Sequence, residues 1–132
     1  MAAANITRGY SKISIDGTET SGTILFGGIL TAWYLKQVGN SYTLTFNPCL
    51  FTQLITQTIQ AGNIILPTID KTVIQQIPVI TSDGTTITNT VGIFMMSSST
   101  ITIYSSIGGT PFTQDTTNLQ GWSNSIIINF TV

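Results

Sequence analysis

The chain has 132 residues, a formal net charge of −1 and only 7% charged residues, where about 25% is usual. Its length fits one domain, and its four Lys and Arg residues cannot form the basic surface that nucleic-acid binding requires. With 42% hydrophobic residues and a mean hydropathy of +0.35, the surface must be mostly neutral, so copies of the chain repel one another little. This composition favours an oligomer.

The first elements in chain order are short strands. Residues 10–15 alternate in polarity before Asp16-Gly17, and residues 22–26 form a second extended run. The strongest local pattern follows, in which residues 29–38 and 42–46 are joined through Gly39-Asn40, two residue types that accept positive φ. These runs predict an antiparallel hairpin with one face against a core.

The middle of the chain is less regular. Residues 49–60 are predicted to be irregular or strand, with a short helical turn as the alternative, because their β-branched residues disfavour a helix. Residues 64–66 form a brief apolar run before a proline. Residues 73–81 contain Pro78, which lacks a backbone donor, so this strand is expected at a sheet edge or a bend.

The last third returns to clear alternation. Residues 85–95 place Ile87, Val91, Ile93 and Met95 on one apolar side and are expected to pair with residues 100–104 in a second hairpin. Residues 113–121 are expected to form a long polar loop. The final strand, residues 125–132, is apolar enough to be expected at the centre of its sheet.

These elements predict an all-β fold of about eight to ten strands, an antiparallel β-sandwich of jelly-roll type. We expect residues 1–20 to form an N-terminal arm with a short strand and residues 21–132 to form the sandwich. The first residues lack the pattern of a signal peptide, and no apolar run is long enough to span a bilayer, so membrane insertion is not expected.

The sequence offers little catalytic chemistry. It has no His, which removes the commonest general base and the commonest metal ligand. Its carboxylates are few, and Asp16 and Asp83 stand beside Gly in predicted turns. A hydrolase that uses two carboxylates, or a calcium loop around Asp115, stays a minor alternative. We expect no enzyme activity, no metal and no cofactor, and we expect the lone Cys49 to be a buried apolar residue.

Exposed aromatic rings could serve as stacking platforms for sugars, although core packing explains most of the aromatic residues equally well. Trp122 is the favoured exception because it adjoins the predicted loop. We therefore expect Trp122, Asp115 and Asn118 to contact a ligand or receptor.

One ordered set of motifs goes beyond generic β-structure: Gly22-Thr23, residues 33–44, Ile77-Pro78-Val79, residues 100–104, Phe112-Thr113 and residues 125–130. In this order the motifs resemble the carboxy-terminal head domains of fibre and collagen-like surface proteins of phages and large DNA viruses. Those heads resemble in turn the trimeric jelly rolls of the tumour-necrosis-factor and complement-C1q type. The resemblance covers roughly residues 22–132.

The resemblance implies a homotrimeric head on the virion surface that mediates attachment to a host receptor or glycan, or decorates the particle. Ile127, Tyr104 and Phe130 are the expected trimer-interface residues. Two features depart from the pattern, because there is no collagen-like stalk and residues 49–60 match none of its motifs. The chain is expected to be either a short stand-alone head or a part of a longer protein. The alternative function is a carbohydrate-binding module or adhesin domain.

Overall fold

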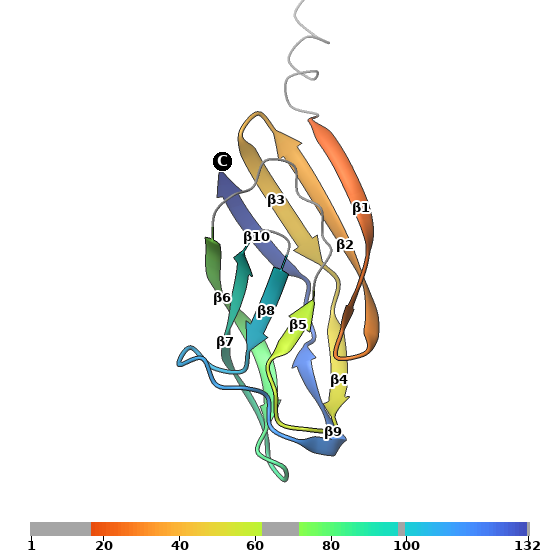
Figure 1. Ribbon diagram of the computed structural model, residues 1–132, viewed down its shortest axis with the longest axis vertical. Coiled ribbons are helices and arrows are strands. Elements are labelled where there is room, and N and C mark those ends of the chain that lie inside the picture. Colours follow the sequence, from red (N-terminus) through yellow and green to blue (C-terminus); the bar gives the residue numbers. More distant parts are fainter. Residues whose placement is uncertain (1–16, 62–71, 98–99, 132) are drawn as a thin grey trace, which may run out of the picture.

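The computed structural model describes residues 17–61, 72–97 and 100–131, and within them the chain forms ten strands and no helix (Figure 1). The strands build two antiparallel sheets, which confirms the predicted all-β sandwich. The small sheet has the order β1 (Thr18–Phe26), β2 (Ile29–Val38), β3 (Ser41–Phe46) and β10 (Ile126–Thr131). The large sheet has the order β4 (Cys49–Gln53), β9 (Asp115–Trp122), β6 (Thr72–Ser82), β7 (Ile87–Ser97), β8 (Thr100–Tyr104) and β5 (Ile59–Ala61).

The hairpin at Gly39-Asn40 is confirmed. Val38 pairs with Ser41 across the turn, and Gly39 has a φ of 60°, which a residue with a side chain rarely adopts. Tyr42 and Leu44 point into the core, as the alternation of β3 predicts. The second predicted hairpin is confirmed as well, because β7 and β8 pair antiparallel.

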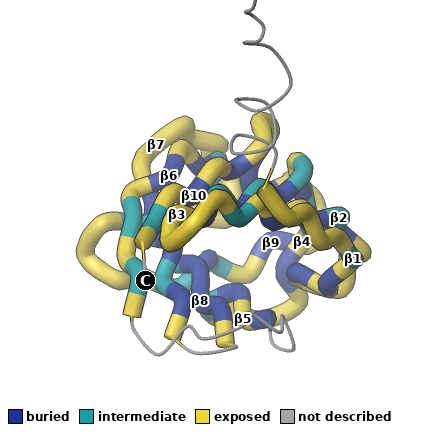
Figure 2. The backbone as a smooth tube through the Cα atoms, turned by 90° about the horizontal axis from the view of Figure 1, so that it is seen from above, coloured by how far each residue is buried: buried dark blue, intermediate teal, exposed yellow. Residues whose placement is uncertain are grey.

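The inward faces of the two sheets meet in one hydrophobic core, and the buried positions line the interior that both sheets surround (Figure 2). Aromatic rings pack edge to face within and between the sheets: the ring centroid of Phe26 in β1 lies 5.4 Å from that of Phe46 in the same sheet and 5.1 Å from that of Trp122 in β9 of the large sheet. Edge-to-face packing is the preferred geometry of such rings. The core therefore fixes how the two sheets sit on each other.

Two predictions about strand positions are wrong, and one is wrong in part. Residues 73–81 lie in β6, inside the large sheet, so the edge alternative is wrong and the bend stays a prediction. Pro78 is tolerated there because β6 pairs with its neighbour β9 at Ile80 alone. Residues 115–122 form β9 and not a loop. The final strand, β10, is an edge strand, and its Ile127 carbonyl accepts a 2.8 Å hydrogen bond from Gln75 Nε2 of β6.

Other predictions are settled in part or fall outside the described residues. Residues 49–60 hold the strand β4, an irregular stretch and the start of β5, so the prediction of irregular or strand structure is confirmed and the helical turn does not occur there. β1 begins at Thr18, before the predicted boundary at residue 21. The strands expected at residues 10–15 and 64–66 lie outside the described residues. The small sheet is a three-stranded meander with β10 added beside β3, and the finer expectation of a jelly roll stays a prediction.

The described chain starts and ends at one end of the sandwich, and its irregular connections gather at the other (Figure 1). The connection between β2 and β3 lies near the terminal end. The connections between β4 and β5, between β6 and β7, and between β8 and β9 lie at the opposite end, which we call the loop end.

Candidate functional site

Trp122 is a core residue and not an exposed ligand contact. Its side chain is 1% exposed, and its ring packs edge to face on Phe26 and Phe51. Its indole Nε1 donates a 2.9 Å hydrogen bond to the carbonyl of Asn47. The prediction is wrong because residues 115–122 pair with β4, with Trp122 opposite Cys49, and this pairing turns the ring inward.

Asp115 and Asn118 lie together at the loop end, but their side chains form a hydrogen bond with each other. The Asp115 carboxylate accepts hydrogen bonds from the backbone N–H groups of Thr117 and Asn118, each at 2.9 Å, and from the Asn118 amide at 3.0 Å. It also accepts one from the Ser82 hydroxyl of β6. These bonds, led by that of the Asn118 N–H, hold the pKa of Asp115 well below its usual range. The carboxylate therefore ties β9 to β6 and is not a free ligand group.

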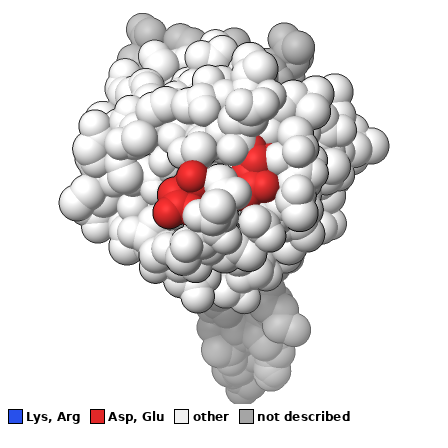
Figure 3. Space-filling view, turned by 90° about the horizontal axis from the view of Figure 1, so that it is seen from below, with Lys and Arg blue, Asp and Glu red and all other residues white. Residues whose placement is uncertain are grey.

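The other carboxylate of the loop end, Asp83, caps the turn between β6 and β7. It accepts hydrogen bonds from the backbone of Thr86 and from the backbone and hydroxyl of Thr85, and the two backbone bonds are the main cause of its lowered pKa. Seen from this end, acidic atoms form neighbouring patches with no Lys or Arg atoms among them (Figure 3). A glycosidase needs one carboxyl group with a raised pKa as its general acid. Asp83 and Asp115 both have lowered pKa values, so this pair does not supply one.

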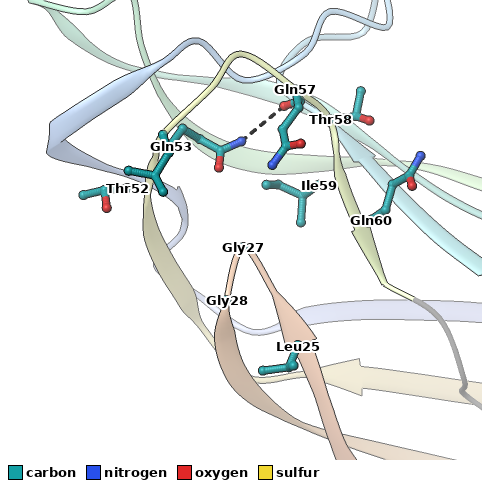
Figure 4. Close-up of a pocket in the computed structure, with 10 residues that line it drawn as sticks. Leu25, Gly27, Gly28, Thr52, Gln53, Gln57, Thr58, Ile59 and Gln60 are labelled. Atoms are coloured by element: carbon teal, nitrogen blue, oxygen red, sulfur yellow. Dashed lines mark hydrogen bonds between the residues drawn. The ribbon is translucent and has the colours of Figure 1, made fainter.

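An open cleft of about 810 Å³ lies between the β1–β2 turn and the β4–β5 segment (Figure 4). Leu25, Gly27 and Gly28 form one side, and residues 52–54 and 57–60 form the other. The Gln53 side chain donates a 3.3 Å hydrogen bond to the Gln57 carbonyl. The described residues line the cleft with amides, hydroxyls and aliphatic groups and no ionisable side chain, so they offer hydrogen bonds but no acid or base.

The outer face of the large sheet carries a group of apolar side chains on β6, β7 and β8 that are exposed or partly buried. We call this group the uncharged face: Ile74, Pro78, Val91, Ile93, Met95 and Tyr104. The exposed Gln76 lies within it. The strand register sets these residues side by side, with Ile74 opposite Met95, Pro78 opposite Val91 and Ile93 opposite Tyr104. Ile74 is 63% exposed and Val91 is 43% exposed.

The predicted alternation of β7 is confirmed, and the side that holds Val91, Ile93 and Met95 is the outer one. Gly92, Phe94 and Met96 face the core, so Val91 and its alternating neighbours face out. Phe94 and Met96 are the sequence feature that makes the inward side ambiguous, because with them large apolar side chains stand on both sides of the strand. When both sides are apolar, alternation alone cannot say which side is buried.

The three residues expected at a trimer interface do not lie together. Tyr104 belongs to the uncharged face, whereas Ile127, 52% exposed, lies on the outer face of the small sheet. Phe130 is partly buried and stacks on Tyr42 with ring centroids 5.2 Å apart. A ring of three copies joins two different surfaces of each copy, so residues on different faces do not by themselves exclude a trimer. The role of these three residues at a trimer interface stays a prediction. Tyr104 belongs to the uncharged face, and Phe130 packs against the hydrophobic core.

No protein-family model matches this chain, and no curated protein matches it significantly. The resemblance to viral head domains therefore stays a prediction. Within residues 17–61, 72–97 and 100–131, no group of three or more His, Cys, Asp or Glu residues is placed to hold a metal ion, and no helix long and apolar enough to cross a membrane occurs.

Proposed function

We propose that this chain is a non-enzymatic structural protein that associates with copies of itself. Its trimer would form a virion-surface or fibre-head domain that mediates attachment or decorates the particle. The uncharged face is the single observation that carries the proposal. Both the proposed location on a virion and the trimeric state come from the sequence resemblance.

The size of the uncharged face supports a role in association. Its residues span about 14 Å along β6 and β7 and about 10 Å across three strands, so with its margins the face covers on the order of 300 Å². Apolar patches of this size on a protein surface are often functional. A stable interface covers roughly 800 Å² per partner, so the uncharged face would be the apolar centre of a larger contact with a polar rim.

The distribution of charge also favours a second copy as the partner. The described charged residues lie elsewhere: Glu19 and Lys36 on the small sheet, and Asp83 and Asp115 at the loop end. An uncharged sheet face offers nothing to an oppositely charged partner, but it packs on another sheet without repulsion. The described termini at one end leave the loop end free to point outward, which is the arrangement a head domain needs (Figure 1).

The experiment is the solution mass by size exclusion with light scattering across a tenfold dilution. The proposal expects a stable mass near three times 14.2 kDa for the wild type. Val91→Lys places a charge at the exposed end of the uncharged face, opposite Pro78, and is expected to give a folded monomer, because burying an unpaired charge is costly. Thr23→Lys, on the exposed outer side of β1, is the matched control and is expected to keep the wild-type mass.

A wild type that stays monomeric at every concentration would overturn the proposal. The second candidate, a carbohydrate-binding module or adhesin domain, would then be favoured. The specific observation for it is the ring of Tyr34, which is 50% exposed on the outer face of the small sheet.

A further inference from the structure

We propose that the outer face of the small sheet holds a binding groove for a neutral saccharide, centred on Tyr34. The inference rests on the proposed function in one respect: it names the class of ligand that an attachment protein would bind. The groove lies on the opposite sheet from the uncharged face, so its binding is tested separately from assembly.

Two rows of paired residues build the groove. In one row Tyr34 of β2 lies between Ser21 of β1 and Thr45 of β3. In the next row Lys36 lies between Glu19 and Thr43. Directly opposite residues in antiparallel strands have Cβ atoms roughly 5 Å apart, so these six side chains form a compact patch. The depression that they line has a volume of about 520 Å³.

The exposure of Tyr34 is not explained by the core. Its chain neighbours Trp33 and Leu35 point inward and are buried, whereas the Tyr34 ring is half exposed on the outer side. A flat aromatic ring that is open to solvent provides an apolar platform with a hydroxyl group at its tip. A sugar ring has a matching form, with an apolar face of C–H groups and a rim of hydroxyls.

The polar groups around the ring match the hydroxyl rim. Glu19 supplies acceptors, Lys36 supplies donors, and the Thr45 hydroxyl can donate or accept. The Thr43 hydroxyl donates a 2.9 Å hydrogen bond to the side-chain oxygen of Asn129, which leaves its lone pairs to accept from a ligand. An apolar surface with a few convergent polar groups is the usual composition of a small-ligand site.

The charges select a neutral ligand. One carboxylate and one ammonium group stand opposite each other on β1 and β2, so the described residues give the groove no net charge. A sulfated or sialylated glycan would need a cluster of basic groups, and Lys36 is the one basic residue among the described residues that line this depression. The cleft beside Gly27 has hydrogen-bonding groups but no aromatic ring among the described residues that line it, so Tyr34 is what distinguishes the groove (Figure 4).

The groove is shallow and open, so one site is expected to bind weakly, with a Kd of about 1 mM, and several sites in one assembly would raise the avidity. The probe is an array of neutral oligosaccharides that end in glucose, galactose, mannose or N-acetylglucosamine, with sialylated counterparts beside them. The affinity of the strongest neutral hit is then measured by titration in solution. Tyr34→Ala is expected to weaken that binding by about tenfold or more, and Tyr34→Phe to change it by less than about threefold.

Thr23→Ala lies on the same sheet face, outside the groove, and serves as the matched control with unchanged binding. Urea unfolding checks that each variant is folded, and light scattering on the same samples reports the assembly state. The inference is overturned if the wild type binds no neutral oligosaccharide at millimolar concentration, if it binds only the sialylated ones, or if Tyr34→Ala binds as well as the wild type. A monomeric wild type that binds a neutral sugar through Tyr34 would refute the trimer and support the groove.

Discussion

Replacing Trp122 by Ala should destabilise the fold and not simply remove a ligand contact. The indole ring fills the core between Phe26 and Phe51, and its Nε1 donates to the Asn47 carbonyl. Asn47 joins the two sheets at the connection between β3 and β4, because its own N–H donates a 3.0 Å hydrogen bond to the Ala32 carbonyl of β2. The substitution therefore removes core volume and one of the bonds at this junction.

The expected size of the effect follows from these two losses. Truncation of a buried Trp to Ala costs about 3–5 kcal/mol through lost transfer energy and the cavity that remains. The Asn47 carbonyl loses its donor as well, which adds about 1 kcal/mol or more. The total of about 4 kcal/mol or more is a large share of the roughly 5–15 kcal/mol that stabilises a typical domain.

The assay is urea unfolding followed by circular dichroism, at one protein concentration because association would shift the midpoint. Trp122→Phe keeps a ring but loses the N–H donor, so a smaller loss of about 1–3 kcal/mol is expected. Tyr34→Ala is the exposed control and should change the unfolding free energy by less than about 1 kcal/mol. A Trp122→Ala variant as stable as the wild type would refute the reasoning.

Two further predictions concern the backbone and the loop end. Gly121 has a φ of 126°, and an added Cβ would lie 2.1 Å from the Cys49 carbonyl oxygen, so Gly121→Ala should cost more than about 2 kcal/mol of folding free energy or prevent soluble expression. The control is Gly28→Ala, which should cost about 1 kcal/mol because Gly28 has a φ of 81° but open space around it. Equal losses of stability for the two variants in thermal unfolding would contradict this account. Acidification should weaken the fold, because the lowered pKa of Asp115 gives stability that is present above about pH 4 and is lost as the pH falls. Urea midpoints at pH 6 and pH 3 should therefore differ more for the wild type than for Asp115→Asn, and an equal drop in both would show that Asp115 is not the sensitive group.

Local features of the sequence are enough to predict the strands whose pattern carries a complete signal. The hairpin around Gly39-Asn40 combines a two-residue turn with strands that are apolar on one side, so turn chemistry and alternation agree. The absence of His and the small number of carboxylates also limit the candidate chemistry, since both follow from composition alone. The groove around Tyr34 could not be predicted in this way, because it depends on which residues of three strands lie side by side.

The all-β class, the Gly39-Asn40 turn and the alternation of β3 and β7 follow from the amino-acid sequence alone, because they depend on residues that are neighbours in the chain. The side of β7 that faces the core and the pairing of residues 115–122 with β4 are properties of the tertiary structure. So are the burial of Trp122 and the exposure of Val91. The physical reason is that burial depends on where a strand lies in its sheet and on what the opposite sheet covers, and both depend on contacts between residues that are distant in the chain.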